Sequence, residues 1–240
     1  MTEEAQNIPE LLKQRVTAAP DKPFLFSEAD NRQFTYREVA AAVNRTAQLL
    51  AGKGVGKGDV VSLLLPNSVE YVIAYFACWQ IGALAGPINS LLKAQEIEYV
   101  ISNSEARALL VNSEYLPLIE TIRDQLQNTL QAVIVFDNEA VATSSVLETE
   151  TPSAEISSED EAIIIYTSGT TGKPKGCLLT HGNVIANARQ ISSWLGFSEA
   201  DRLLTMMPLF HMNAVSVTTM SALYAGGSTV VSQKFSASRF

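Results

Sequence analysis

Short apolar runs alternate with segments of helical period along this 240-residue chain, and this alternation limits its fold more than any other feature. Val60 to Leu65 is an apolar run broken only by Ser62 and ended by Pro66-Asn67, as expected of a strand buried on both faces. Strands of that kind, separated by helices, form parallel sheets that are covered by the helices. The sequence therefore predicts an α/β fold of mostly parallel sheets flanked by helices.

The helix expected from about Thr35 to Ala51 has the clearest start signal. Thr35 and Glu38 have the spacing of a capping box, in which each side chain accepts a hydrogen bond from the other residue's backbone amide. A buried helix followed by a strand is expected from Val69 to Ile88, where Glu70 and Pro87 do not suit a membrane span. Further helices are expected near 114–126 and 183–195, and further strands near 108–111, 132–136, 163–166, 203–206 and 229–231.

Residues 139–160 are rich in Ser, Thr and Glu and poor in large apolar residues, which is typical of a surface linker. This segment predicts a division of the chain into three parts. Residues 1–138 are expected to form a first α/β sheet unit, 139–160 the linker, and 161–240 the start of a second α/β unit.

Charge and targeting signals exclude several classes of protein. The formal net charge is −8, from 17 Lys+Arg against 25 Asp+Glu, which argues against electrostatic attachment to nucleic acid or to an anionic membrane. Cys78 and Cys177 lie far apart, so we interpret both as buried thiols in a reducing compartment. The N-terminal segment is acidic and lacks the order of a signal peptide, so the expected location is the cytoplasm.

The candidate chemistry is concentrated in residues 163–176, IIIYTSGTTGKPKG, where an expected strand ends in a polar loop. From Thr167 to Gly176, ten residues supply four hydroxyl groups, three glycines and two lysines. Glycines let backbone amides approach an anion, hydroxyl groups donate to phosphate oxygens, and lysines offset the negative charge. The combination predicts a polyphosphate site.

Two other interpretations of this loop bear on its role. A Walker A loop would require Gly in place of Thr167 and Ser or Thr in place of Pro174, so an ordinary P-loop NTPase is disfavoured. A hairpin whose Gly, Ser and Thr residues only form turns stays open on spacing alone. Two lysines and four hydroxyl groups in one loop favour the anion site.

The segment YTSGTTGKPKG at 166–176, followed by an expected strand at 177–179, closely resembles the phosphate-binding signature of the adenylate-forming superfamily. That superfamily contains acyl-CoA synthetases, adenylation domains of peptide synthetases and luciferases. The resemblance extends to FTYREVA at 34–40, to the stretch from PNSVEY at 66–71 to PIN at 87–89, and to PLFHMN at 208–213, so it covers nearly the whole chain.

The resemblance implies ATP-dependent activation of a carboxylic acid to its acyl-AMP, with bound Mg²⁺ and release of pyrophosphate. A thiol, usually that of coenzyme A (CoA), then takes the acyl group. PLFHMN is more similar to acyl-CoA ligases than to amino-acid-activating domains. An acid–thiol ligase with a place in fatty-acid metabolism is therefore the expected function.

The resemblance also assigns roles by position. Lys173 and His211 are the implied catalytic residues, Lys173 because it faces the pyrophosphate leaving group and His211 because it lies beside the reacting carboxylate. A lone histidine by itself favours a core or capping role, and a solvated charge is an equally good interpretation of Lys175. No residue of the chain is implied as a metal ligand. The residues implied to bind the ATP phosphates are Thr167, Ser168, Gly169, Thr170, Thr171, Gly172, Lys173 and Lys175.

Other residues near the loop have two possible interpretations. His181 stands next to Gly182 at an expected helix start, and we interpret it as structural. Five apolar side chains could line an acyl pocket, but at their spacing ordinary core residues are more common. They are Met206, Met207, Met212, Val215 and Val217.

Full members of the superfamily continue for about as long again beyond the point that matches Phe240. The Mg²⁺ carboxylate, the aspartate for the ribose hydroxyl groups and the adenylation lysine are expected there, so we expect the isolated chain not to turn over and to self-associate through uncovered sheet edges. Two other functions stay open. One is an adenylation domain that loads the phosphopantetheine of a carrier protein, and the other is a phosphate-binding fragment without catalysis.

Overall fold

The computed structural model describes residues 5–137, 154–167 and 173–233. Its strands are β1 (Pro23–Ser27), β2 (Gln33–Thr35), β3 (Val60–Leu64), β4 (Leu84–Pro87), β5 (Ala108–Val111), β6 (Ala132–Val135), β7 (Glu161–Thr167), β8 (Lys175–Thr180), β9 (Arg202–Thr205) and β10 (Ser228–Val231). Its helices are α1 (Ile8–Ala18), α2 (Tyr36–Gly52), α3 (Val69–Gln80), α4 (Ala94–Asn103), α5 (Leu116–Glu120), α6 (Arg123–Leu126), α8 (His181–Leu195) and α9 (Ser221–Ala225), with a 3₁₀ turn η1 (Ser113–Tyr115) and a π-helix η2 (Ala214–Met220).

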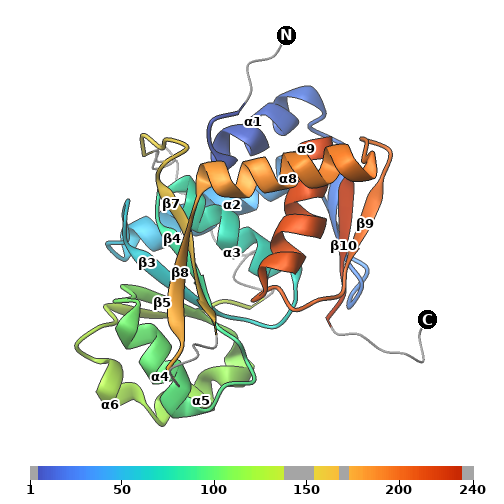
Figure 1. Cartoon of the computed structure of the whole chain (residues 1–240). Helices are drawn as coiled ribbons and strands as arrows, with labels where there is room; N and C mark the ends of the chain where they lie inside the picture. The colour runs from blue at the N-terminus through green and yellow to red at the C-terminus, as the bar shows by residue number, and fades with distance from the viewer. Residues whose placement is uncertain (1–4, 138–153, 168–172, 234–240) are drawn as a thin grey trace.

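Two sheets and the helices around them make up the fold (Figure 1). The larger sheet has the strand order β6-β5-β3-β4-β7-β8, and the smaller has the order β2-β1-β10-β9. All neighbouring strands run parallel except the pairs β7–β8 and β1–β2. The expected class, mostly parallel sheets flanked by helices, is confirmed. None of the helices in the described ranges combines the length and apolar character that a membrane crossing requires.

Both sheets take strands from either side of segment 139–160, contrary to the expected pair of separate sheet units. Ala85 of β4 lies opposite Ile163 of β7 in the larger sheet, and Leu25 of β1 lies opposite Thr229 of β10 in the smaller one. Parallel strands are joined by long crossover connections, so strands that are neighbours in a sheet need not be neighbours in the sequence. Apolar patterning reports that a strand is buried and does not identify its partners.

Local signals predicted individual elements well where they were strong. The capping box of α2 is present, with the Glu38 amide donating to Thr35 Oγ1 (3.2 Å) and the Thr35 amide donating to Glu38 Oε2 (2.7 Å). The single helix expected near 114–126 is instead three short pieces, η1, α5 and α6. Pro117 lacks an amide hydrogen and so begins a helix more readily than it continues one, and the backbone at Ile122 (φ −121°, ψ 13°) is not helical.

Helix α3 is the buried centre of the molecule. All its residues except Gln80 are buried. The indole N–H of Trp79 donates to the Ala162 carbonyl on β7 (2.9 Å), which ties the helix to the larger sheet. One apolar core includes Val61 of the larger sheet and Leu25 of the smaller, so α3 packs in a core that both sheets share.

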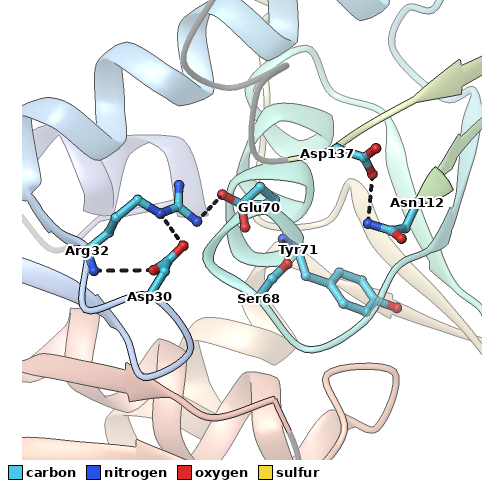
Figure 2. Close-up of polar contacts among 7 residues, drawn as sticks. All are labelled: Asp30, Arg32, Ser68, Glu70, Tyr71, Asn112 and Asp137. Atoms are coloured by element: carbon cyan, nitrogen blue, oxygen red, sulfur yellow. Dashed lines mark hydrogen bonds and ion pairs between the residues drawn. The ribbon is translucent and has the colours of Figure 1, made fainter. Parts of the chain in front are cut away.

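A charged contact joins the smaller sheet to the start of α3 (Figure 2). Arg32, just before β2, lies 2.8 Å from Glu70 Oε1 in the first turn of the helix, and 2.6 Å from Asp30. The Glu70 side chain is only 3% exposed. Removing one partner of a buried ion pair leaves a poorly solvated charge, which costs far more than the loss of an exposed pair.

We therefore expect Arg32→Leu to lower the free energy of unfolding by about 1–3 kcal/mol, because Glu70 stays buried without its guanidinium partner. Urea denaturation of the purified chain measures this difference. Arg37→Leu is the matched control, because the Arg37–Asp21 pair (3.0 Å) has side chains that are 62% and 82% exposed. Equal losses in the two variants would contradict a special role for the buried contact.

Candidate functional site

The predicted phosphate loop connects strands β7 and β8, which pair as an antiparallel hairpin. The hairpin register runs from Glu161 opposite Thr180 to Thr167 opposite Lys175, and β8 is the edge strand of the larger sheet. Thr167, at the end of β7, is exposed. Five of the predicted phosphate-binding residues lie outside the described residues, namely Ser168, Gly169, Thr170, Thr171 and Gly172.

Lys173 and Lys175, on the β8 side of the loop, are exposed, and neither forms an ion pair with a described residue. Lys173 Nζ lies 5.4 Å from the centroid of the Tyr99 ring on α4, and the Tyr99 hydroxyl donates to the Pro174 carbonyl (3.2 Å). Both lysine charges are therefore open to an anion, and α4 supports the β8 end of the loop.

The β7 end of the hairpin is bound to the same helix. The Tyr166 hydroxyl donates to Asn103 Oδ1 (2.8 Å), one helical turn after Tyr99 on α4. Sequence patterns did not indicate these contacts, because Tyr166 and Asn103 are 63 residues apart in the chain. Helix α4 and the hairpin are thus joined at both ends of the predicted loop.

His211 lies between β9 and η2 and is exposed. Its amide donates to the Pro208 carbonyl (2.9 Å) in a tight turn, and its ring centroid lies 4.5 Å from that of Phe210. The helical segment begins at the next residue, Met212.

An open pocket of about 620 Å³ separates the hairpin from the His211 turn. The pocket brings together two of the predicted site residues, Thr167 and His211, while Lys173 and Lys175 do not line it. Mostly apolar walls with a few polar groups are typical of sites for small organic ligands. The lining residues are Ile165, Thr167, Cys177, Leu179, Met207, His211, Met212 and Asn213.

The comparison with protein families shows which family the chain belongs to. A family model described as "AMP-binding enzyme" matches residues 12–240, almost the whole chain. The chain belongs to the AMP-binding enzyme family.

Relatives of this AMP-binding enzyme are longer than the chain. It is 35% identical over 220 residues to the long-chain-fatty-acid–CoA ligase FadD13 of Mycobacterium tuberculosis, a match that covers 91% of this chain and 44% of the relative. It is 34% identical over 228 residues to the crotonobetaine/carnitine–CoA ligase of Citrobacter koseri, which covers 90% and 44%. The chain therefore spans less than half the length of these curated relatives.

Solved structures of similar proteins have the same fold as this chain. The inhibitor-bound N-terminal domain of FACL13 from Mycobacterium tuberculosis superposes with a TM-score of 0.87 at 32% identity, covering 98% of this chain and 59% of that one. The anthranilate CoA ligase AuaEII in complex with anthranoyl-AMP gives a TM-score of 0.86 at 32% identity, covering 95% of this chain and 44% of that one.

Within this AMP-binding enzyme, the expectation of two buried thiols is half right. Cys78 is fully buried, and burial raises the pKa of its thiol. Cys177 is exposed and lines the pocket, so its interpretation as buried was wrong. The physical reason is its place on β8, the edge strand, where the described elements leave the side chain uncovered.

The apolar residues near His211 divide between pocket and core. Met207 and Met212 line the pocket next to His211. Met212 also borders a second cavity of about 480 Å³, which Val217 lines together with residues of α8. Val215 is buried core (2% exposed). The second cavity thus adjoins the first at Met212.

His181 is buried at the first residue of α8, away from the pocket. Its Nδ1 accepts a hydrogen bond from the Ile8 amide at the start of α1 (3.4 Å), and burial lowers its pKa to about 4. These contacts support its interpretation as structural. Within the described ranges, no group of three or more His, Cys, Asp and Glu side chains is placed to hold a metal ion.

Proposed function

We propose that this AMP-binding enzyme acts as part of an acyl-CoA ligase that uses ATP to activate a carboxylic acid. The observation that carries the proposal is the pocket that Thr167 and His211 share. Thr167 begins the loop with the phosphate-binding composition, and His211 lies where a substrate carboxylate can enter. The names of the relatives point the same way, because FadD13 and the Citrobacter koseri protein are both CoA ligases.

In the proposed first step, a carboxylate oxygen of the acid forms a bond to the α-phosphorus of ATP while the bond from that phosphorus to pyrophosphate breaks. The chain's contribution is to hold the phosphates. Exposed Lys173 and Lys175, without ion pairs among the described residues, suit a polyanion, and donors already in place around a leaving group stabilise its growing charge. The predicted loop residues Ser168–Gly172 belong to the same proposed site.

Mg²⁺ is the usual counter-ion of nucleotide phosphates, and the proposal assigns it no ligand among the described residues. In the proposed second step, the thiol of CoA attacks the acyl carbon and AMP leaves. This choice of acceptor is supported by the names of the CoA ligase relatives. The proposal also keeps the cytoplasm as the site of action.

The walls of the pocket suit the apolar part of an acid. Ile165, Leu179 and Met207 supply aliphatic surface, whereas His211 and Thr167 supply the polar groups. An imidazole can donate a hydrogen bond to the carboxylate and so hold it for attack.

We expect His211→Ala to raise the Michaelis constant for the acid or slow adenylation, by about ten-fold, because one positioned hydrogen bond to a charged group is lost. ATP binding is expected to stay nearly normal. The measurement is ATP–pyrophosphate exchange at varied acid concentration in the full-length gene product, with ATP affinity measured separately by calorimetry. Loss of ATP affinity with an unchanged response to the acid would place His211 in the nucleotide site or in the core that supports it.

A further inference from the structure

The backbone just before His211 is held by side chains from a distant part of the chain. The Leu209 amide donates to Asn67 Oδ1 (2.7 Å), and the Leu209 carbonyl accepts from the Tyr75 hydroxyl (2.9 Å). The Met207 carbonyl accepts from Asn67 Nδ2 (2.9 Å). The segment Met207–Leu209 is therefore bound on both sides, two residues before the imidazole.

Asn67 joins the two sheets through its one amide group. It follows β3 of the larger sheet and is 7% exposed. Besides the Met207 carbonyl after β9, its Nδ2 donates to the Ser232 carbonyl after β10 (3.2 Å). Both N–H groups and the oxygen of the side chain are thus used, and the need to serve two carbonyls and one amide fixes its orientation.

Tyr71 lies on the same helix as Tyr75, α3, and serves as a comparison for it. Tyr71 and Tyr75 stack in α3 with ring centroids 5.4 Å apart, and both are buried. The Tyr71 hydroxyl donates to the Leu63 carbonyl on β3 (3.3 Å), whereas the Tyr75 hydroxyl donates to the Leu209 carbonyl. The two tyrosines therefore make the same kind of bond, and only that of Tyr75 reaches the segment before His211.

We infer that Asn67 and Tyr75 are positioning residues for His211. Their side chains hold the peptide Met207–Leu209, which overlaps the start of the tight turn from Pro208 to His211. Because this peptide is held in place, the turn places the imidazole on the wall of the pocket opposite the hairpin. A reacting group works only when neighbouring contacts keep it in place, and a buried carbonyl that loses its donor shifts to find another. The inference rests on the function proposed for His211, but its test does not.

The test uses the two histidines of the chain as reporters. NMR spectra of the imidazole groups of the 240-residue chain contain one signal from exposed His211 and one from buried His181. We expect Tyr75→Phe to move the His211 signal, because the Leu209 carbonyl loses its donor and the peptide before the imidazole shifts. Tyr71→Phe is the matched control, and we expect it to leave the His211 signal unchanged although it too removes a buried hydrogen bond.

Asn67→Asp gives a second variant of nearly the same size, in which both N–H donors are lost. We expect it to change the His211 signal at least as much as Tyr75→Phe does. If Asn67→Asp does not fold, the comparison of Tyr75→Phe with Tyr71→Phe tests the inference. The inference is overturned if Tyr75→Phe and Tyr71→Phe affect His211 equally, if neither affects it, or if a folded Asn67→Asp protein leaves it unchanged. Because no acid or ATP is present, these outcomes are separate from those of the His211→Ala experiment.

Discussion

Lys173→Ala is expected to lower acid-dependent ATP–pyrophosphate exchange by about ten-fold to a thousand-fold in the full-length gene product, because it removes a preplaced positive donor to a leaving group that gains charge. Lys173 is exposed at the base of the hairpin loop and forms no ion pair with a described residue, so apart from its contact with the Tyr99 ring its charge is open to an anion. Thr170→Val, in the predicted loop, is expected to fall in the same range.

The stability of the fold is expected to change little in either variant, because an exposed side chain such as Lys173 buries little surface. Lys53→Ala is the matched control, since Lys53 is also exposed and its loss changes the net charge by the same amount. Exchange rates that are unchanged in both loop variants would refute the phosphate-binding role. An equal loss in Lys53→Ala would show that net charge, rather than position, matters.

The second large effect concerns stability and pH. Burial lowers the pKa of His181 to about 4, from an ordinary value of 6.5, although Asp160 nearby opposes that shift and Lys57 adds to it. The unfolded chain therefore takes up a proton below about pH 6.5, while the folded chain keeps His181 neutral. We expect the free energy of unfolding to be constant above pH 6.5 as far as this group is concerned, and to fall by roughly 3 kcal/mol between pH 6.5 and 4.

Urea denaturation at a series of pH values measures this fall. His181→Asn is expected to remove most of it, because asparagine can still accept a hydrogen bond from the Ile8 amide but does not titrate. His211→Asn is the control that should keep it, since His211 is exposed. The carboxyl groups with lowered pKa, those of Glu38, Asp30, Asp160 and Asp201, lose stabilisation only below their ordinary values of 4.5 for Glu38 and 3.8 for the aspartates. A fall above about pH 4.5 that persists in His181→Asn would therefore contradict the assignment.

Elements that depend on neighbouring residues could be predicted from the sequence. The capping box of α2 needs only Thr35 and Glu38, three residues apart, and the strand expected at 108–111 is β5 with the same bounds. The order of strands could not be predicted in this way. The neighbours β1 and β10 are about two hundred residues apart in the sequence, and the apolar pattern of each strand fits many partners.

The residues of the candidate site could likewise be predicted only where their own neighbourhood in the sequence identified them. The polar residues themselves pointed to Thr167 and, through the resemblance, to His211, and both line the pocket. The side chains that hold the site in place, Tyr99 for the hairpin and Asn67 and Tyr75 for the His211 turn, gave no such signal. Each acts through one hydrogen bond or a few to distant backbone, and nothing in its own neighbourhood distinguishes it from an ordinary core or surface residue.

Acid-dependent exchange of pyrophosphate into ATP by the full-length gene product tests the central claim most directly. The experiment supplies ATP, Mg²⁺, labelled pyrophosphate and one member at a time of a panel of aliphatic and aromatic carboxylic acids. We predict label in ATP with at least one acid, none without acid, and a loss of exchange in Lys173→Ala. Binding of ATP or pyrophosphate without exchange for any acid would contradict the account, because the protein would then bind phosphate without activating a carboxylate.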